Sequence, residues 1–176
     1  MKKILIVVDM QNDFIDGSLG TKEAVGIVDD VVKEIGNDYD HIICTRDTHH
    51  ENYMDTNEGR HLPVVHCVKD TQGWQIRDEV MKAVEDKGNY EIIDKPTFGS
   101  ETMVDVLKKY DEEEKIEEIT LLGLCTDICV VSNALLVKAA FPEIRVAVKQ
   151  NCCAGVTTDS HEAALTTMRM CQIEVE

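Results

Sequence analysis

Short apolar runs separated by stretches of helical periodicity constrain the fold of this chain more than any other feature. The runs are rich in Ile, Val and Leu and lack the strict alternation of a half-buried strand, a pattern typical of parallel strands covered on both faces. Strands that alternate with helices predict an α/β three-layer sandwich with a mostly parallel six-stranded sheet. The expected strands are Ile4–Val8, His41–Thr45, Glu91–Asp94, Ile119–Leu124, Arg145–Val148 and Gln172–Val175. The expected helices are Glu23–Ile35, Ile76–Val84, Glu101–Tyr110, Asp127–Ala140 and Asp159–Met170.

The length and charge of the chain bound its organisation and its partners. With 176 residues and no repeat or linker, the sequence predicts one domain over residues 1–176. The formal net charge of −16 repels phosphate backbones and anionic lipid, so it argues against nucleic-acid and membrane partners. Lys2 and Lys3 precede only five apolar residues before Asp9, which is too short for a secretory signal. The expected location is therefore the cytoplasm, where the seven cysteines would be reduced thiols.

Polar residues follow several of the predicted strands at the point where each strand ends. Asp9 follows the first, Asp47 the second, Lys95 the third and Cys125 the fourth. Sites in open parallel sheets collect beyond the carboxyl ends of the strands, so these residues should converge in space. The segment from Thr48 to Val64 has little periodicity and is long for a connector, which is typical of functional loops.

The stretch GLCTDICV places two cysteines at a predicted strand-to-helix junction. Thr126 is the expected N-cap, which would put Cys129 in the first helical turn. Free N–H groups and the helix dipole there would lower the pKa of a thiol and could hold an oxyanion. Cys125 precedes the cap and is expected to pack into the core. We therefore predict that Cys129 is a nucleophile, against the alternative that both cysteines are inert core residues.

Two other interpretations of the cysteine pair fit its spacing less well. A redox pair would have two residues between the cysteines rather than three. A zinc clip would need further Cys or His ligands at finger-like spacing, and none follow. The nucleophile hypothesis gains from Asp9, which could take the thiol proton, and from Lys95, whose ammonium would stabilise a thiolate. The alternative is that Asp9 caps a loop and Lys95 is exposed to solvent.

A second group of residues has the composition of a metal site. Asp47 and His49 lie two apart just beyond a strand, and His66 follows later. One carboxylate and two imidazoles form a common set for a first-row metal with open positions, and Glu58 could supply a fourth ligand. His50 and His61 are competing candidates, and solvated loop histidines are the alternative. His161, on the last predicted helix, is expected at the surface or near a cap.

Five motifs resemble those of the isochorismatase-like cysteine hydrolases, most closely the nicotinamidase branch. They are ILIVVDMQNDF, TRDTH, HCVKDTQGW, DKPTFGS and GLCTDICV, and they run in order from Ile4 to about Ala154. The resemblance implies the isochorismatase-like hydrolase fold and a catalytic triad of Asp9, Lys95 and Cys129. These are the residues that strand ends and helix capping also single out.

The resemblance implies further site features. A non-proline cis peptide is expected at Leu124–Cys125, with an oxyanion hole from the amides of Cys125 and Cys129. A divalent metal, zinc with manganese or iron as alternatives, would bind a substrate ring nitrogen. The implied metal ligands are Asp47, His49 and His66, with Glu58 in a place comparable to an acidic ligand of some members.

The residues expected to line the substrate pocket depart in part from the nicotinamidase pattern. Phe14 belongs to the N-D-F motif, whereas Leu62 and Pro63 stand where nicotinamidases commonly carry an aromatic residue, and Phe98 lies in TFGS rather than Ser-Ala-Phe. From these places in the motifs, the expected substrate contacts are Phe14, Leu62 and Phe98. Trp74 and Tyr53 are expected to serve packing.

The function that the resemblance implies is hydrolysis of the carboxamide of a small molecule through a Cys129 thioester. Nicotinamide, giving nicotinate and ammonia as in pyridine nucleotide salvage, is the first expected substrate. The alternatives are another small amide or ureido hydrolase, an isochorismatase-type hydrolase, and a non-catalytic metal- or ligand-binding member. Relatives often form dimers or tetramers, so a homo-oligomer is expected.

Overall fold

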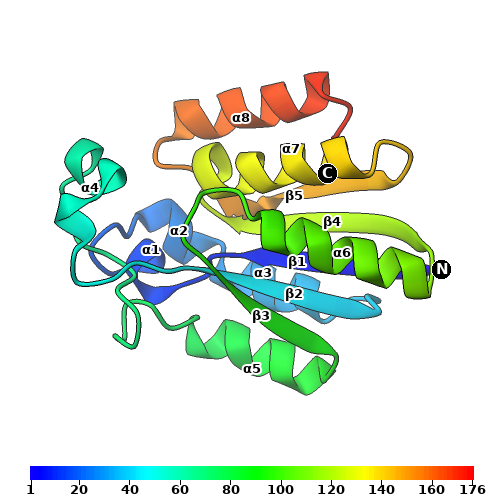
Figure 1. Ribbon diagram of the computed structural model, residues 1–176, viewed down its shortest axis with the longest axis horizontal. Helices are drawn as coiled ribbons and strands as arrows, with labels where there is room; N and C mark the ends of the chain where they lie inside the picture. The colour runs from blue at the N-terminus through cyan, green and yellow to red at the C-terminus, as the bar shows by residue number, and fades with distance from the viewer.

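A six-stranded sheet forms the middle layer of the structure, a computed structural model that describes residues 1–176 (Figure 1). All neighbouring strands pair in parallel, in the order β3-β2-β1-β4-β5-β6. All six predicted strands are therefore confirmed, and the sheet is entirely rather than mostly parallel. The strands are β1 (Lys2–Val8), β2 (His41–Asp47), β3 (Tyr90–Lys95), β4 (Ile116–Leu124), β5 (Arg145–Ala154) and β6 (Glu174–Val175).

The central strand β1 shows why its sequence lacks alternation. Ile6 pairs with Ile43 of β2 and with Leu121 of β4, so both edges of β1 are hydrogen-bonded. Helices cover both faces of the sheet, and every residue from Ile4 to Val8 is at most 1% exposed. A strand buried on both faces has no position at which a polar side chain reaches water.

Helices form the two outer layers. In Figure 1, α6, α7 and α8 lie side by side on one face, and α3 and α5 cover the other. No helix combines the length and the apolar character that a membrane span requires. The helices are α1 (Asn12–Ile15), α2 (Lys22–Gly26), α3 (Val28–Ile35), α4 (Asn57–His61), α5 (Asp78–Lys87), α6 (Glu101–Glu113), α7 (Val131–Ala140) and α8 (Thr158–Met170).

The start of the helix after β4 differs from the prediction. The helix opens with a π-helical turn, Thr126–Val130, whose N-cap is Cys125 and not Thr126. The N–H groups of Ile128 and Val130 both donate to the Cys125 carbonyl, at 3.1 and 3.0 Å, which widens the turn. Thr126 is fully buried, and its hydroxyl contacts the ring Nδ1 of His161 at 2.8 Å instead of capping the helix.

Two further segments also differ from the prediction. The expected helix Glu23–Ile35 divides at Ile27 into α2 and α3, and the Thr21 side chain caps α2 by accepting from the Ala24 N–H at 3.0 Å. The irregular segment from Thr48 to Val64 contains the 3-10 turn Tyr53–Asp55 and the short helix α4. Figure 1 shows α4 projecting beyond the edge of the sheet where β1 and β2 end.

The strand order fixes where a site can form. The order reverses direction between β1 and β4, because the chain adds strands on one side of β1 first and then on the other. Connections therefore leave the carboxyl ends of β1 and β4 in opposite directions and open a crevice there. Asp9 follows β1 and Cys125 follows β4 directly at this crevice.

Candidate active site and metal centre

Lys95 lies between a carboxylate and a thiol at the carboxyl edge of the sheet. Its Nζ is 2.7 Å from Oδ2 of Asp9 and 3.4 Å from Sγ of Cys129. Asp9, Lys95 and Cys129 are 0%, 1% and 4% exposed, respectively. Three segments far apart in the sequence thus deliver the three residues that strand ends and the cysteine motif singled out.

The backbone and β2 together aim the carboxylate of Asp9. Asp9 adopts a left-handed backbone conformation with φ of 47°, which is uncommon for a residue with a side chain. The Thr45 hydroxyl donates to Oδ1 at 2.7 Å, leaving Oδ2 to face Lys95. Burial raises the pKa of Asp9 above its ordinary value, although the Lys95 ammonium opposes that rise. Asp9 is therefore a stronger base than an exposed aspartate.

The prediction of a lowered thiol pKa is wrong for the free protein. Burial and the adjacent Asp9 carboxylate raise the pKa of Cys129 well above its ordinary value, and Lys95 opposes them only in part. Burial disfavours the charge on Lys95, but the carboxylates of Asp9 and Asp47 outweigh it and raise the Lys95 pKa. The free site therefore holds a neutral thiol beside a Lys95–Asp9 ion pair.

The backbone at the end of β4 has three unusual features. The peptide bond between Leu124 and Cys125 is cis, as the family resemblance implies. The N–H of Cys125 donates to no group of the protein. Gly123 has φ of 121°, and a Cβ at this position would lie 2.1 Å from the carbonyl oxygen of Val8. Only glycine lets β4 approach the end of β1 so closely.

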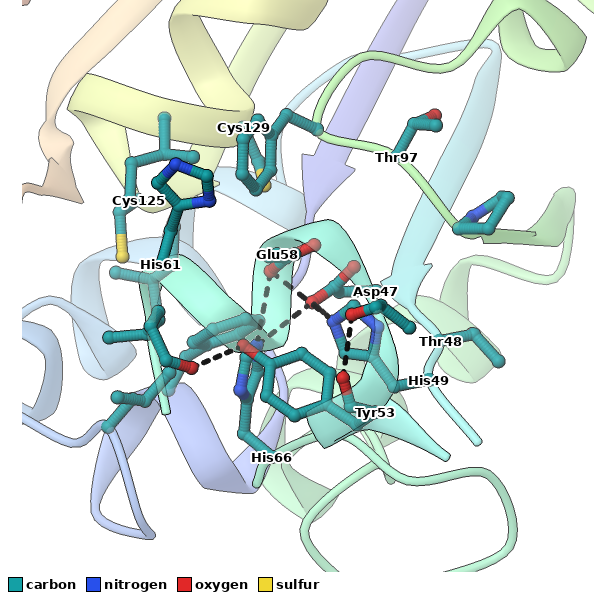
Figure 2. Close-up of a pocket in the computed structure, with 18 of the residues that line it drawn as sticks. Asp47, Thr48, His49, Tyr53, Glu58, His61, His66, Thr97, Cys125 and Cys129 are labelled. Carbon is teal, nitrogen blue, oxygen red and sulfur yellow. Dashed lines mark hydrogen bonds and ion pairs between the residues drawn. The ribbon is translucent and has the colours of Figure 1, made fainter. Parts of the chain in front are cut away.

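The side chain of Cys125 lies elsewhere than predicted. It is partly exposed and lines the same cavity as Cys129, rather than packing into the core (Figure 2). Burial of its thiol, together with the charge of Asp127, raises its pKa to about 12. The hydrogen bond from Lys95 goes to Cys129 alone of the two. The structure therefore distinguishes the two cysteines by the ammonium beside Cys129.

The four predicted metal ligands converge at one end of this cavity (Figure 2). One ligand atom from each lies within 4.8 Å of the others. Nε2 of His49 is 3.0 Å from Asp47 Oδ2 and 3.5 Å from Glu58 Oε1. Nε2 of His66 is 3.4 Å and 3.8 Å from the same two oxygens. Tetrahedral zinc with bonds near 2.0–2.2 Å separates its ligand atoms by roughly 3.3 Å, so the cluster has the size of such a site.

The surroundings of the cluster also suit a cation. Nδ1 of His66 is 2.7 Å from the Val64 carbonyl, which can only accept, so Nδ1 carries the proton and Nε2 keeps a lone pair. Burial opposes a charge on His49, yet hydrogen bonds to Asp47 and Glu58 raise its pKa to about 9. The cluster thus attracts positive charge, and its donor set fits a divalent metal.

The competing histidines lie outside the cluster. His50 and His61 are both exposed, and both line the cavity without belonging to the cluster. The ring of His61 is held by the Asn57 carbonyl, 2.8 Å from Nδ1. His161 lies on α8 beside Thr126, as a partner of the cysteine turn rather than a surface group.

One cavity of about 1030 Å³ joins the two groups of residues. Its wall includes Cys129, Cys125 and the four residues of the metal cluster. The three predicted substrate contacts, Phe14, Leu62 and Phe98, line the same cavity. A ligand bound here can therefore meet the thiol and the metal cluster together.

Sequence reasoning missed two residues that hold the metal cluster in place. Gln11 donates to the carbonyl of Asp47 at 2.8 Å and accepts from its N–H at 2.7 Å. Asp13 accepts from the N–H of Cys67 at 2.8 Å, one residue after His66. Both lie in the motif DMQNDF, so their place in that motif was the signal. The motif therefore positions the metal cluster as well as Asp9.

Two aromatic residues of open role have specific contacts. Tyr53 is fully buried, and its ring centroid is 4.7 Å from His49 and 5.0 Å from His66. Its hydroxyl donates to the Leu62 carbonyl at 2.8 Å, which ties α4 to the cluster. The indole N–H of Trp74 donates to the Thr48 hydroxyl at 2.8 Å, directly after the end of β2. Both residues pack, as expected, and both support the cluster.

Comparisons with known proteins agree with the geometry. The family model for the isochorismatase domain matches residues 3–176. A nicotinamidase of Saccharomyces cerevisiae is 30% identical over 174 residues, covering 76% of this chain and 80% of that protein. The crystal structure of a nicotinamidase/pyrazinamidase from Bacillus subtilis has a TM-score of 0.84, 26% identity and 99% coverage of both chains.

A third comparison concerns the fold. The pyrazinamidase of Pyrococcus horikoshii, solved in complex with zinc, has a TM-score of 0.77 and 24% identity, covering 100% of this chain and 99% of that one. Together, the strand order, the Asp9–Lys95–Cys129 geometry and the full-length family match lead to one assignment. The chain belongs to the isochorismatase family, in its nicotinamidase branch.

Proposed function

We propose that this protein hydrolyses the carboxamide of a small molecule through a thioester on Cys129, with nicotinamide as the first substrate to test. The observation that carries the proposal is the position of Lys95 Nζ, 2.7 Å from Asp9 and 3.4 Å from Cys129, beside a cavity that the thiol lines. The names of the related nicotinamidases supply the choice of nicotinamide.

Asp9 is the proposed general base. The pKa of Cys129 is too high for a standing thiolate, so the proton must leave as the thiol attacks. The raised pKa of Asp9 suits that transfer, because a carboxylate whose pKa approaches that of the thiol is a better acceptor. Lys95 stays protonated and stabilises the negative charge that moves from Asp9 to the sulfur.

The attack forms a C–S bond and places a negative charge on the carboxamide oxygen. The amides of Cys125 and Cys129 are the proposed oxyanion hole, supported by the unpartnered N–H of Cys125. Removing one such donor typically lowers the rate by about a hundredfold or more. When the C–N bond breaks, Asp9 returns its proton to the leaving nitrogen, and ammonia departs.

Water completes the reaction. It attacks the thioester carbon while Asp9 takes one of its protons, and the C–S bond breaks to release the carboxylic acid. Asp9 then returns that proton to the sulfur. One amide and one water thus give one acid and one ammonia, and the thiol is restored.

Asp47, His49, Glu58 and His66 are the proposed ligands of a divalent metal, with zinc as the first candidate and manganese or iron as alternatives. When bound, such a cation would supply a Lewis acid that orients and polarises a ring nitrogen or carbonyl of the substrate. Tyr53 and Gln11 would hold two of these ligands in place.

We also propose that the protein acts in the cytoplasm. The support is that all seven cysteines are free thiols, as expected in a reducing compartment.

The test is ammonia release from nicotinamide by the purified protein, with and without added zinc or manganese. Cys129→Ala is expected to abolish release, whereas the matched variant Cys125→Ala keeps most of it, because only the Cys125 backbone has a proposed role. Trapping the acyl-enzyme by rapid denaturation and mass spectrometry would place the thioester on Cys129. Appreciable turnover by Cys129→Ala would refute the covalent route.

A further inference from the structure

The cavity changes in character from its base to its mouth. At the base, Cys129, His49 and His66 are at most 7% exposed. At the mouth, three apolar side chains from separate segments line the cavity while remaining open to solvent. They are Leu62 (37% exposed), Phe98 (45%) and Val156 (54%).

These three side chains are a large fraction of the exposed large hydrophobic side chains of the protein. Eight large hydrophobic side chains are exposed on the whole protein, and three of them border this one cavity. Exposed apolar groups that gather at a pocket mark a binding surface more often than scattered ones do. We name Leu62, Phe98 and Val156 the apolar rim.

The volume of the cavity exceeds what one small ring requires. Cavities of roughly 300–1,000 Å³ hold drug-sized ligands, and this cavity measures about 1030 Å³. A pyridine ring with one carboxamide, held at the thiol and the metal cluster, would occupy only its base. The apolar rim would then contact nothing on the substrate.

The spare volume lies beside the acyl portion of the substrate, which becomes the carboxylic acid, and not beside the leaving nitrogen. Asp9, the proposed proton donor to the leaving nitrogen, is 0% exposed and does not line the cavity, and neither does Lys95. The side on which the nitrogen departs is therefore closed, which suits ammonia. A larger group can extend only from the acyl portion toward the rim.

We propose that the preferred substrates are primary carboxamides whose acyl portion carries an apolar substituent that packs against the apolar rim. This inference rests on the proposed function, and it specifies the substrate class. The chemistry is unchanged: water and the amide give the substituted carboxylic acid and ammonia. A second copy of the chain is the other occupant that the rim could take, and the experiment distinguishes it.

The experiment compares kcat/KM for nicotinamide with that for nicotinamides bearing methyl, butyl or phenyl groups on ring carbons. The best substituted amide is expected to exceed nicotinamide by about tenfold or more, because apolar burial contributes in proportion to area. In Val156→Ser, the ratio of the two kcat/KM values is expected to fall by about threefold or more. The matched control is Val25→Ser, an equally exposed valine on α2 outside the cavity, which should leave the ratio unchanged.

The possible failures are distinct. If nicotinamide is hydrolysed and every substituted amide is slower, the inference is overturned while the proposed function stands. If Val156→Ser changes the sedimentation coefficient but not the ratio, the rim belongs to an interface between copies, and the inference is again overturned. If no carboxamide is hydrolysed by the metal-loaded protein, the proposed function fails and the inference falls with it.

Discussion

Asn133 donates a hydrogen bond to the carbonyl of Cys129 at 2.8 Å, one turn further along the helix. The same Nδ2 donates to the Phe98 carbonyl at 3.1 Å, and Oδ1 accepts from the Ser100 N–H at 2.9 Å. Asn133 is fully buried. Both its amide nitrogen and its amide oxygen are hydrogen-bonded, and together they join the cysteine turn to the segment after Lys95. This contact fixes the separation of the proposed nucleophile from its ammonium.

Asn133→Ala is expected to lower kcat by about tenfold or more with a smaller change in KM, because small displacements of reacting groups are costly. It should also lower stability by about 1–3 kcal/mol, since buried backbone groups lose their partners. Steady-state kinetics and urea unfolding measure the two effects. The control is Asn151→Ala, at an exposed asparagine. A stability loss with unchanged kcat would show that Asn133 serves folding alone.

The rate should depend on pH through Asp9. Catalysis needs its deprotonated form, and burial raises its pKa above the ordinary 3.8. As the pH falls through that raised pKa, Asp9 becomes protonated and kcat/KM declines. The midpoint of this decline, the acid limb of the pH–rate profile, should therefore lie above pH 3.8. Lys95→Met removes the charge that opposes the rise, so it should move the limb to still higher pH while lowering the maximal rate.

The measurement is kcat/KM against pH with metal occupancy determined at each point, so that loss of metal is not taken for protonation of Asp9. Lys82→Met, at a lysine whose side chain is 74% exposed, is the matched control and should leave the limb in place. A limb at or below the ordinary value in the unmodified protein would contradict the role given to Asp9.

The metal cluster predicts which histidines bind metal. His66→Ala removes a ligand with its Nε2 turned to Asp47 and Glu58, so affinity should fall by about a hundredfold or more. His61→Ala, at an exposed histidine lining the same cavity, should leave affinity unchanged. Elemental analysis after dialysis and a zinc titration provide the readout. Equal metal content in both variants would mean that the cation binds elsewhere.

The architecture was largely predictable because it depends on local composition. Strands such as β1 and β4 are apolar throughout, so burial on both faces could be read from their residues. The ends of the predicted strands then located Asp9 and Lys95, since parallel strands end at one edge, and the cysteine motif after the fourth strand located Cys129. The spacing of aspartate and histidine located the metal cluster in the same way, because Asp47 ends β2 and His49 lies two residues further along.

What the sequence could not predict depends on contacts between distant segments. The N-cap at Thr126 was wrong because His161, on α8, takes its hydroxyl. The low thiol pKa was wrong because burial and the Asp9 carboxylate, which raise the pKa of Cys129, outweigh the Lys95 ammonium, which lowers it. The role of Asn133 could not be predicted, since the residues next to it in the sequence do not indicate a contact with the segment after Lys95.

The approach of β4 to β1 gives a prediction about stability. Gly123→Ala would place a Cβ 2.1 Å from the Val8 carbonyl oxygen at φ of 121°. Backbone atoms at the centre of the sheet cannot move aside, so the variant should lose more than about 3 kcal/mol or fail to fold. The matched control is Gly26→Ala, where a Cβ meets nothing within 4 Å in helix α2. That variant should gain about 0.4–1 kcal/mol, because alanine restricts the unfolded chain. Urea unfolding of both measures the difference, and similar midpoints would show that the β1–β4 junction yields to a methyl group.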